Sequence, residues 1–139
     1  MSCLSGARNY ALDSSFLIYH YYKGDDVTNG ILKAGFLNLV AFSEALYVIC
    51  RKEGVATALN FVKDTSKTVK VVPSERIALM AGQFKCKYPV SLADCWVLAT
   101  SKVFNVPALF VFREKELLAH IDAIREEAEV EFLDEIIKK

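Results

Sequence analysis

The sequence predicts one domain, residues 1–139, folded as a three-layer α/β/α sandwich around a central parallel sheet. Short apolar runs that suit buried strands alternate with longer segments of helical apolar spacing. Such alternation is typical of parallel sheets joined by right-handed crossovers. A length of 139 residues fits a single domain, and no repeat, low-complexity tract or linker divides the chain.

The first half of the chain is expected to hold one strand and four helices. An apolar run forms the strand, and a glycine-containing turn ends the helix that follows it. Asn38 is a suitable N-cap for the third helix, and Gly54 lies just beyond its end. The strand covers residues 9–13, and the helices cover 14–22, 27–33, 39–53 and 55–64.

The second half is expected to alternate more regularly. Pro73 stops a valine-rich strand, and Ser74 and Ser91 are suitable N-caps for the two helices that follow. The strands are expected at 67–72, 108–112 and 130–133, and the helices at 75–85, 92–104 and 114–127, before a charged tail at 134–139.

Composition excludes several classes of protein. The net charge is zero, so the whole chain carries no basic field that would attract nucleic acid, although a local basic rim remains compatible with this sum. The apolar window 36–50 is interrupted by Glu44 and falls short of the roughly 20 residues that span a bilayer. Without a signal peptide or membrane span, we expect a cytoplasmic protein with no membrane partner. Hydrophobic residues make up 53% of the chain, which favours a self-association surface.

The four cysteines contain no C-x-x-C pair, and the chain has only two histidines, too few correctly spaced ligands for a structural zinc site. A disulfide between Cys86 and Cys95 stays an open alternative.

Four acidic residues stand in unusual places. Asp13 ends the first strand, and ligands of open α/β sheets bind outside the carboxyl ends of the strands. Glu44 lies in a largely apolar helix with no Lys or Arg three or four residues away, where an ionised carboxylate is costly. Asp94 begins another apolar helix, and Glu114 follows the strand at 108–112.

Each acid also has a structural explanation. Asp13 suits an N-cap, Ser91 and Asp94 match a capping box, and first-turn acids such as Glu114 are common on solvated helices. Glu44 suits a partly exposed helix face or a neutral carboxyl bonded to a carbonyl. A parallel sheet can gather all four at its carboxyl edge, and carboxylates in one pocket favour a hard divalent cation.

The segments that carry these acids resemble the motifs of PIN domains, in order and with suitable spacing. The closest type is the small prokaryotic one that includes VapC toxins. This resemblance implies a parallel α/β/α fold over nearly the whole chain, with Asp13, Glu44 and Asp94 as the core ligands of Mg²⁺ or Mn²⁺. The matching segments are residues 11–18, 41–46, 91–100 and 108–117.

The last motif departs from the family pattern twice. Glu114, the fourth expected ligand, stands where the family usually has an aspartate, and Phe112 stands where it often has a Ser or Thr that supports the site. Ser14 or Ser15 matches the small polar residue that follows the first aspartate in the family, and is expected to hold a ligand or a water.

RNA contacts require cations at the rim of the crevice. The candidates lie near turns or helix ends, where the alternative is an ordinary surface cation. The aromatic run 19–22 could stack unpaired bases, although packing or a dimer seam is the favoured interpretation. The candidate cations are Lys23, Lys85, Lys87, Lys102 and Arg113.

The resemblance implies a metal-dependent endoribonuclease that hydrolyses RNA phosphodiester bonds, usually a homodimer and often the toxin partner of an antitoxin protein in a type II pair. The alternative is a catalytically inactive PIN-like binding or assembly module. A receiver-type phosphate domain is disfavoured, because no acid precedes Asp13. No P-loop, G-x-G-x-x-G or G-x-S-x-G motif is present.

Overall fold

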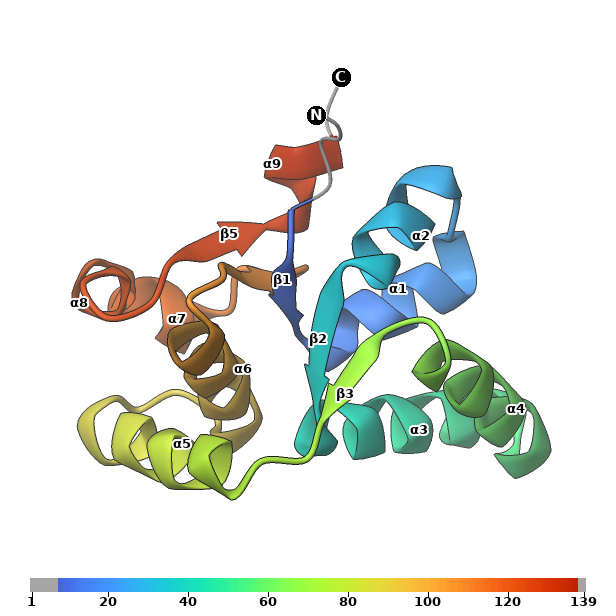
Figure 1. Cartoon of the computed structure of the whole chain (residues 1–139), viewed down its shortest axis with the longest axis horizontal. Helices are drawn as coiled ribbons and strands as arrows, with labels where there is room; N and C mark the ends of the chain where they lie inside the picture. The colour runs from blue at the N-terminus through green and yellow to red at the C-terminus, as the bar shows by residue number, and fades with distance from the viewer. Residues whose placement is uncertain (1–7, 138–139) are drawn as a thin grey trace.

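A computed structural model describes residues 8–137 and shows the expected parallel sheet between two layers of helices (Figure 1). Five strands pair in the order β3-β2-β1-β4-β5, and all four pairings are parallel. The register places Leu12 of β1 beside Leu37 of β2 and Leu109 of β4. The predicted fold class is therefore confirmed. The strands are β1 (Tyr10–Leu12), β2 (Gly35–Asn38), β3 (Lys70–Val72), β4 (Ala108–Phe110) and β5 (Val130–Phe132).

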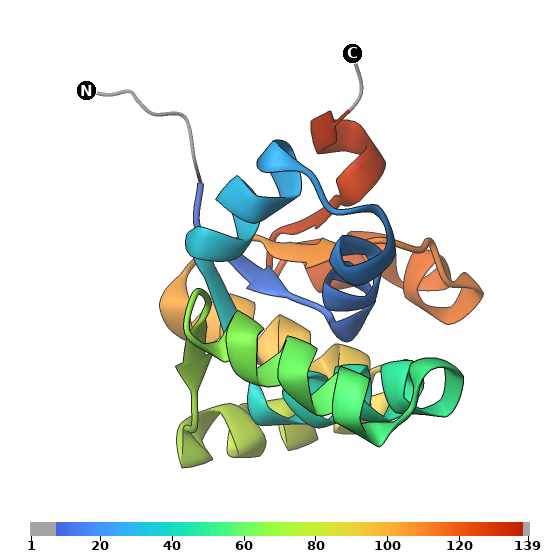
Figure 2. The same ribbon diagram turned by 90° about the vertical axis from the view of Figure 1, so that its right-hand side faces the viewer.

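Helices connect every pair of consecutive strands and cover both faces of the sheet (Figures 1 and 2). Helices α1 to α4 lie on one face together with α9, and α5 to α8 lie on the other. The bounds are α1 (Ser14–Lys23), α2 (Asp26–Lys33), α3 (Leu39–Glu53), α4 (Val55–Ser66), α5 (Glu75–Lys87), α6 (Leu92–Phe104), α7 (Lys115–Ala119), α8 (Ile121–Arg125) and α9 (Leu133–Ile137).

Alternate residues of each strand enter different cores, as the period of two along a strand requires. Leu12, Leu37 and Leu109 pack under α1 to α4, whereas Ala11 and Phe110 pack under α5 to α8. The central strands are buried on both faces, so their sequences are apolar runs rather than alternating ones. The sheet thus fixes β1 and β4 in the middle of the molecule.

The structure differs from the expected elements in several places. β2 was not predicted, because a four-residue segment with Gly at one end and Asn at the other carries little local strand signal. Its pairing with β1 and β3 decides its conformation instead. The helix expected at 114–127 is two short helices separated at His120, where the backbone leaves the helical region. β3 is shorter than the expected strand at 67–72, and α9 forms within the expected tail.

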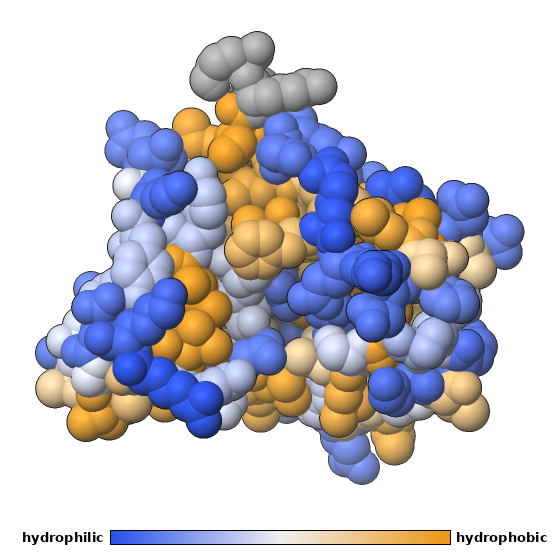
Figure 3. Space-filling view, turned by 180° about the vertical axis from the view of Figure 1, so that it is seen from behind, coloured by the Kyte–Doolittle hydropathy of each residue, from blue (hydrophilic) through white to orange (hydrophobic). Residues whose placement is uncertain are grey.

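The carboxyl ends of the strands define one side of the molecule. Figure 2 shows β1 leading into α1 on the side that Figure 3 faces. Apolar side chains gather in the middle of this face between margins of hydrophilic ones (Figure 3).

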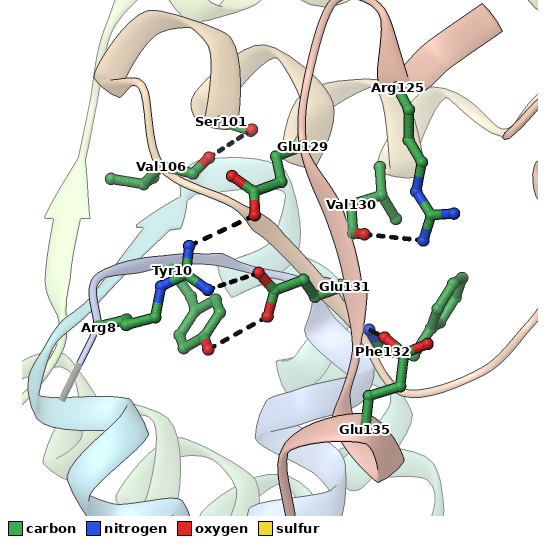
Figure 4. Close-up of polar contacts among 10 residues, drawn as sticks. All are labelled: Arg8, Tyr10, Ser101, Val106, Arg125, Glu129, Val130, Glu131, Phe132 and Glu135. Atoms are coloured by element: carbon green, nitrogen blue, oxygen red, sulfur yellow. Dashed lines mark hydrogen bonds and ion pairs between the residues drawn. The ribbon is translucent and has the colours of Figure 1, made fainter. Parts of the chain in front are cut away.

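A polar cluster ties β1 to β5 across the amino edge of the sheet, although β4 lies between them (Figure 4). Arg8 Nη1 lies 2.7 Å from Glu131 Oε2, and Arg8 Nη2 lies 3.4 Å from Glu129 Oε2. The Tyr10 hydroxyl donates to Glu131 Oε1 at 3.3 Å. Arg8 and Glu129 are more than half exposed, so their ion pairs orient the strand ends more than they stabilise the fold.

Within residues 8–137, no helix combines the length and apolar character needed to cross a membrane. Cys50, Cys86 and Cys95 are free thiols, so the open alternative of a Cys86–Cys95 disulfide is not what the structure shows. Cys3 lies outside the described residues.

We expect Leu37→Ala to lower the free energy of unfolding by about 2–5 kcal/mol, because Leu37 is fully buried in β2 and its truncation leaves a cavity. Leu79→Ala on α5 is the matched control, since Leu79 is 64% exposed and its loss should change stability by at most about 0.5 kcal/mol. Urea unfolding of both variants measures the difference. Equal losses would contradict the placement of β2 in the core.

Candidate functional site

The order of the strands reverses between β1 and β4. The chain runs from β1 outward to β2 and β3, then returns through α5 and α6 to place β4 on the other side of β1. Such a reversal is where open α/β sheets form their ligand crevice. Asp13 directly follows β1, and Glu114 follows β4 by four residues. The topology therefore brings these two acids to the same crevice.

Asp13 begins α1 and is held by the residues that follow it. Its Oδ2 accepts hydrogen bonds from the backbone N–H of Ser15, at 3.2 Å, and from the Ser15 hydroxyl. The same hydroxyl accepts from the backbone N–H of Val111, just beyond β4, at 3.3 Å. Ser15 thus joins the ends of β1 and β4 through Asp13.

Burial raises the pKa of Asp13 to about 6, despite the two hydrogen bonds from Ser15 that lower it. The side chains of Glu44 and Glu114 raise this pKa further through their negative charge. Asp13 is 9% exposed, so water screens it poorly. Asp13 is the N-cap of α1, as the sequence allowed, and its ionised form is at the same time disfavoured by burial.

Glu44 reaches the crevice from α3, and Ser14 holds it there. The Ser14 hydroxyl donates to Glu44 Oε1 at 2.6 Å, and Ser14 itself is buried. The structure corrects one premise of the sequence argument, because α3 is not buried all round: Leu39 is 44% exposed and Tyr47 is 50% exposed. Glu44 is half-buried, and its partner is a hydroxyl rather than a cation.

Asp94 lies in the first turn of α6, where the Ser91 hydroxyl accepts from the Asp94 backbone N–H at 3.1 Å. The residue is 6% exposed. Burial raises the pKa of Asp94, followed by the charges of Asp13 and Glu114 and by a hydrogen bond between the Asp94 and Glu114 side chains. Glu114 stands at the N-cap position of α7 but makes no capping hydrogen bond with its side chain. Its carboxylate is turned to Asp94 instead.

The four acids predicted from sequence are therefore electrostatic neighbours. Asp13 interacts with the other three, and Asp94 interacts with Asp13 and Glu114. Within residues 8–137, however, no three Asp, Glu, His or Cys side chains are already arranged as ligands of one metal ion. Their oxygens bind serine hydroxyls and one another. An all-oxygen set of acids that repel one another has the donor chemistry of a hard divalent cation.

Most of the predicted rim cations already have hydrogen-bond or ion-pair partners within this chain. Lys87 and Lys102 both bind Glu127, at 2.7 Å and 3.1 Å. Lys85 donates to the carbonyl of Val90 at 2.7 Å. Arg113 binds Asp134 and Glu135 of α9. Among the five candidates, Lys23 alone has no ion pair or hydrogen bond with the part of the chain that the structure describes.

Sequence reasoning gave Asn38 only a capping role. Its Oδ1 accepts from the Ala41 N–H at 2.8 Å, as expected for the N-cap of α3. Its Nδ2 is buried without a hydrogen-bond partner in the described residues, at the same carboxyl edge and one strand away from Asp13. An unsatisfied buried donor of this kind is unusual in a folded protein. The unpredicted strand β2 is what brings Asn38 to this edge, so no signal in the sequence indicated it.

The fold and the site together define a doubly wound α/β domain with an acidic cluster at its topological switch point. The chain belongs to the PIN domain family, whose model matches residues 10–124, and the predicted family is thus confirmed. No curated protein sequence matches the chain.

Solved structures of VapBC proteins share the fold at low sequence identity. The chain is similar to one in VapBC2 from Rickettsia felis bound to a promoter DNA fragment, with a TM-score of 0.70, 11% identity, and coverage of 91% of this chain and 99% of that one. A chain of DNA-bound VapBC from Salmonella typhimurium is similar with a TM-score of 0.70 and 13% identity, and the match covers 91% of this chain and 98% of that one. A chain of VapBC-1 from nontypeable Haemophilus influenzae is similar with a TM-score of 0.63 and 15% identity, and the match covers 89% of this chain and 97% of that one.

Asp13→Asn is expected to stabilise the metal-free protein by about 1–3 kcal/mol at neutral pH. The change removes a desolvated charge while keeping a good N-cap, and one pKa unit corresponds to about 1.4 kcal/mol. Asp25→Asn is the matched control, because Asp25 is likewise an N-cap, of α2, but is exposed. Urea unfolding in the presence of EDTA measures both. An Asp13→Asn variant no more stable than Asp25→Asn would show that burying the Asp13 carboxylate carries no such cost.

Proposed function

We propose that this chain is a metal-dependent endoribonuclease that hydrolyses RNA phosphodiester bonds. The observation that carries the proposal is the convergence of Asp13, Glu44, Asp94 and Glu114 at the switch point, where burial and mutual charge raise the pKa of Asp13 and of Asp94. Such perturbed acids in a crevice favour a functional site. Membership of the PIN domain family supports the same reaction class.

Mg²⁺ or Mn²⁺ would be held by these four carboxylates. Such an ion, when bound, polarises the scissile phosphate and makes the attacking water more acidic. Ser14 and Ser15 support the site, since each donates a hydrogen bond to a carboxylate and so restricts its orientation. The side chains of Asp94 and Glu114 interact, and we assign the role of proton acceptor from water to one of these two carboxylates.

Glu114 is the residue that distinguishes this site from the aspartate usual in the family. Its side chain is one methylene longer, and although the residue is exposed its carboxylate interacts with those of Asp94 and Asp13. We therefore propose Glu114 as the fourth ligand or the general base, with Glu114→Asp retaining more activity than Glu114→Gln.

An antitoxin partner and a homodimer form part of the proposal. The likeness of this chain to chains in VapBC complexes supports the partner. Exposed apolar side chains such as Tyr47, Val55 and Leu92 support a self-association surface. Co-purification with the product of a small adjacent reading frame tests the partner, and sedimentation of the isolated chain tests the dimer. A chain that sediments as a monomer at all concentrations would contradict the dimer.

The second candidate function is an inactive PIN-like binding module. Two observations favour it: the ligand set is not preassembled in the described residues, and Phe112 and Glu114 replace side chains usual in the family. Titration with Mn²⁺ by calorimetry separates the candidates. A folded protein that binds no Mn²⁺ would favour the inactive module.

We expect the chain to cleave single-stranded RNA in Mn²⁺ or Mg²⁺ and to lose at least about 100-fold in rate in Asp13→Asn and Asp94→Asn, because each change removes an anionic oxygen ligand. Asp25→Asn, the exposed N-cap variant, should retain full activity. The measurement is the initial rate of cleavage of a labelled RNA with metal or with EDTA. Full activity in the Asp13→Asn chain, or in EDTA, would overturn the proposed function.

A further inference from the structure

An apolar groove runs along α1 beside the acidic cluster. Its floor comes from one face of α1, because residues at spacings of three and four share a side of a helix. The residues after β4 form the opposite wall, and the cavity has a volume of about 380 Å³. We call this cavity the α1 groove; it is lined by Ser15, Ile18, Tyr19, Tyr22, Lys23, Val111 and Phe112.

The groove begins at the site itself. Ser15 lines it and also donates to Asp13 Oδ2, so the groove opens directly beside that carboxylate. From Ser15 the helix rises about 12 Å to Lys23 at the other end. A ligand lying in the groove would therefore extend from the acidic cluster to the one predicted rim cation without a partner in residues 8–137.

Phe112 contributes an exposed aromatic ring to the wall of the groove. Its side chain is 65% exposed and has no ring contact within residues 8–137, so folding does not account for an aromatic residue at this position. Tyr22 is 45% exposed, and its hydroxyl donates to Glu53 Oε2 at 2.7 Å, which fixes the ring. The groove thus offers two exposed aromatic side chains, of which the Tyr22 ring is held in place.

We propose that the α1 groove binds an unpaired base of single-stranded RNA next to the carboxylates that act on its phosphate. This inference rests on the proposed nuclease function and adds to it the place on this chain where a base of the substrate binds. Aromatic side chains stack on any base, and a cation is needed because the acidic cluster repels the phosphate backbone. Lys23 supplies that charge at the far end of the groove. A base in a duplex has no free face, so paired RNA does not fit.

The test measures RNA binding in the Asp13→Asn chain, which leaves the RNA intact, by fluorescence anisotropy with a short labelled single strand. Phe112→Ala is expected to weaken binding about 5- to 150-fold, the effect of one stacked base, and Phe112→Trp to retain it. Leu79→Ala, an equally exposed apolar residue on α5, is the matched control and should bind as the parent does. Lys23→Gln should flatten the slope of log affinity against log salt by about 0.7.

Three outcomes would overturn the groove assignment. In the first, Phe112→Ala binds the single strand as tightly as the Asp13→Asn chain without that change. In the second, Phe112→Ala weakens the binding of duplex RNA by the same factor, which would show that no unpaired base is bound. In the third, Phe112→Ala changes the mass measured by sedimentation but leaves the RNA affinity unchanged, which would show that another protein chain covers the groove.

Failure of the nuclease proposal gives a different result. A parent chain that cleaves no RNA with Mn²⁺ but binds it through Phe112 overturns catalysis and leaves the groove in place. A chain that cleaves RNA with no effect of Phe112→Ala leaves catalysis and overturns the groove. Absence of any RNA binding would overturn both.

Discussion

Burial of carboxylates that also repel one another at the switch point is the constraint on which the site depends. Asp13 and Asp94 are both nearly excluded from water, and each raises the cost of ionising its neighbours. A folded protein keeps such an arrangement only when the rest of the structure supplies enough stability. Here two apolar cores, one on each face of the sheet, supply it. The acidic cluster is therefore better explained by a bound ligand than by its contribution to folding.

The sheet topology brings these acids together, and local hydrogen bonds orient two of them. The reversal of strand order brings the ends of β1 and β4 together, and α3 and α6 begin at the same edge. Ser14 and Ser15 then fix Glu44 and Asp13, so two consecutive hydroxyls in the first turn of α1 orient carboxylates from two different elements. Ser15 also bonds to the backbone after β4. The same residue lines the α1 groove, which joins the acidic site to an apolar surface.

Sequence reasoning recovered the fold class because the long helices carry clear periodicity and caps. Asn38, Ser74 and Ser91 are N-caps as predicted. It missed β2, whose conformation comes from pairing on both sides, and it merged α7 and α8 across His120. The convergence of the four acids was expected from positions near strand ends, at a helix start and in an apolar helix. The family resemblance implied that Ser14 or Ser15 holds a ligand or a water, but not which carboxylate each hydroxyl contacts, because that depends on side-chain geometry. Glu44 was singled out because its helix is largely apolar and was expected to be buried. This reason was wrong in part, since one side of α3 is exposed.

The most direct test of the central claim is anomalous diffraction from a crystal soaked in Mn²⁺. We expect an anomalous peak in contact with carboxylate oxygens of Asp13 and Asp94, at the edge between β1 and β4. Mn²⁺ bound only elsewhere on the molecule, with these carboxylates unchanged, would contradict it. That result would leave the repulsion at the switch point without a ligand to explain it.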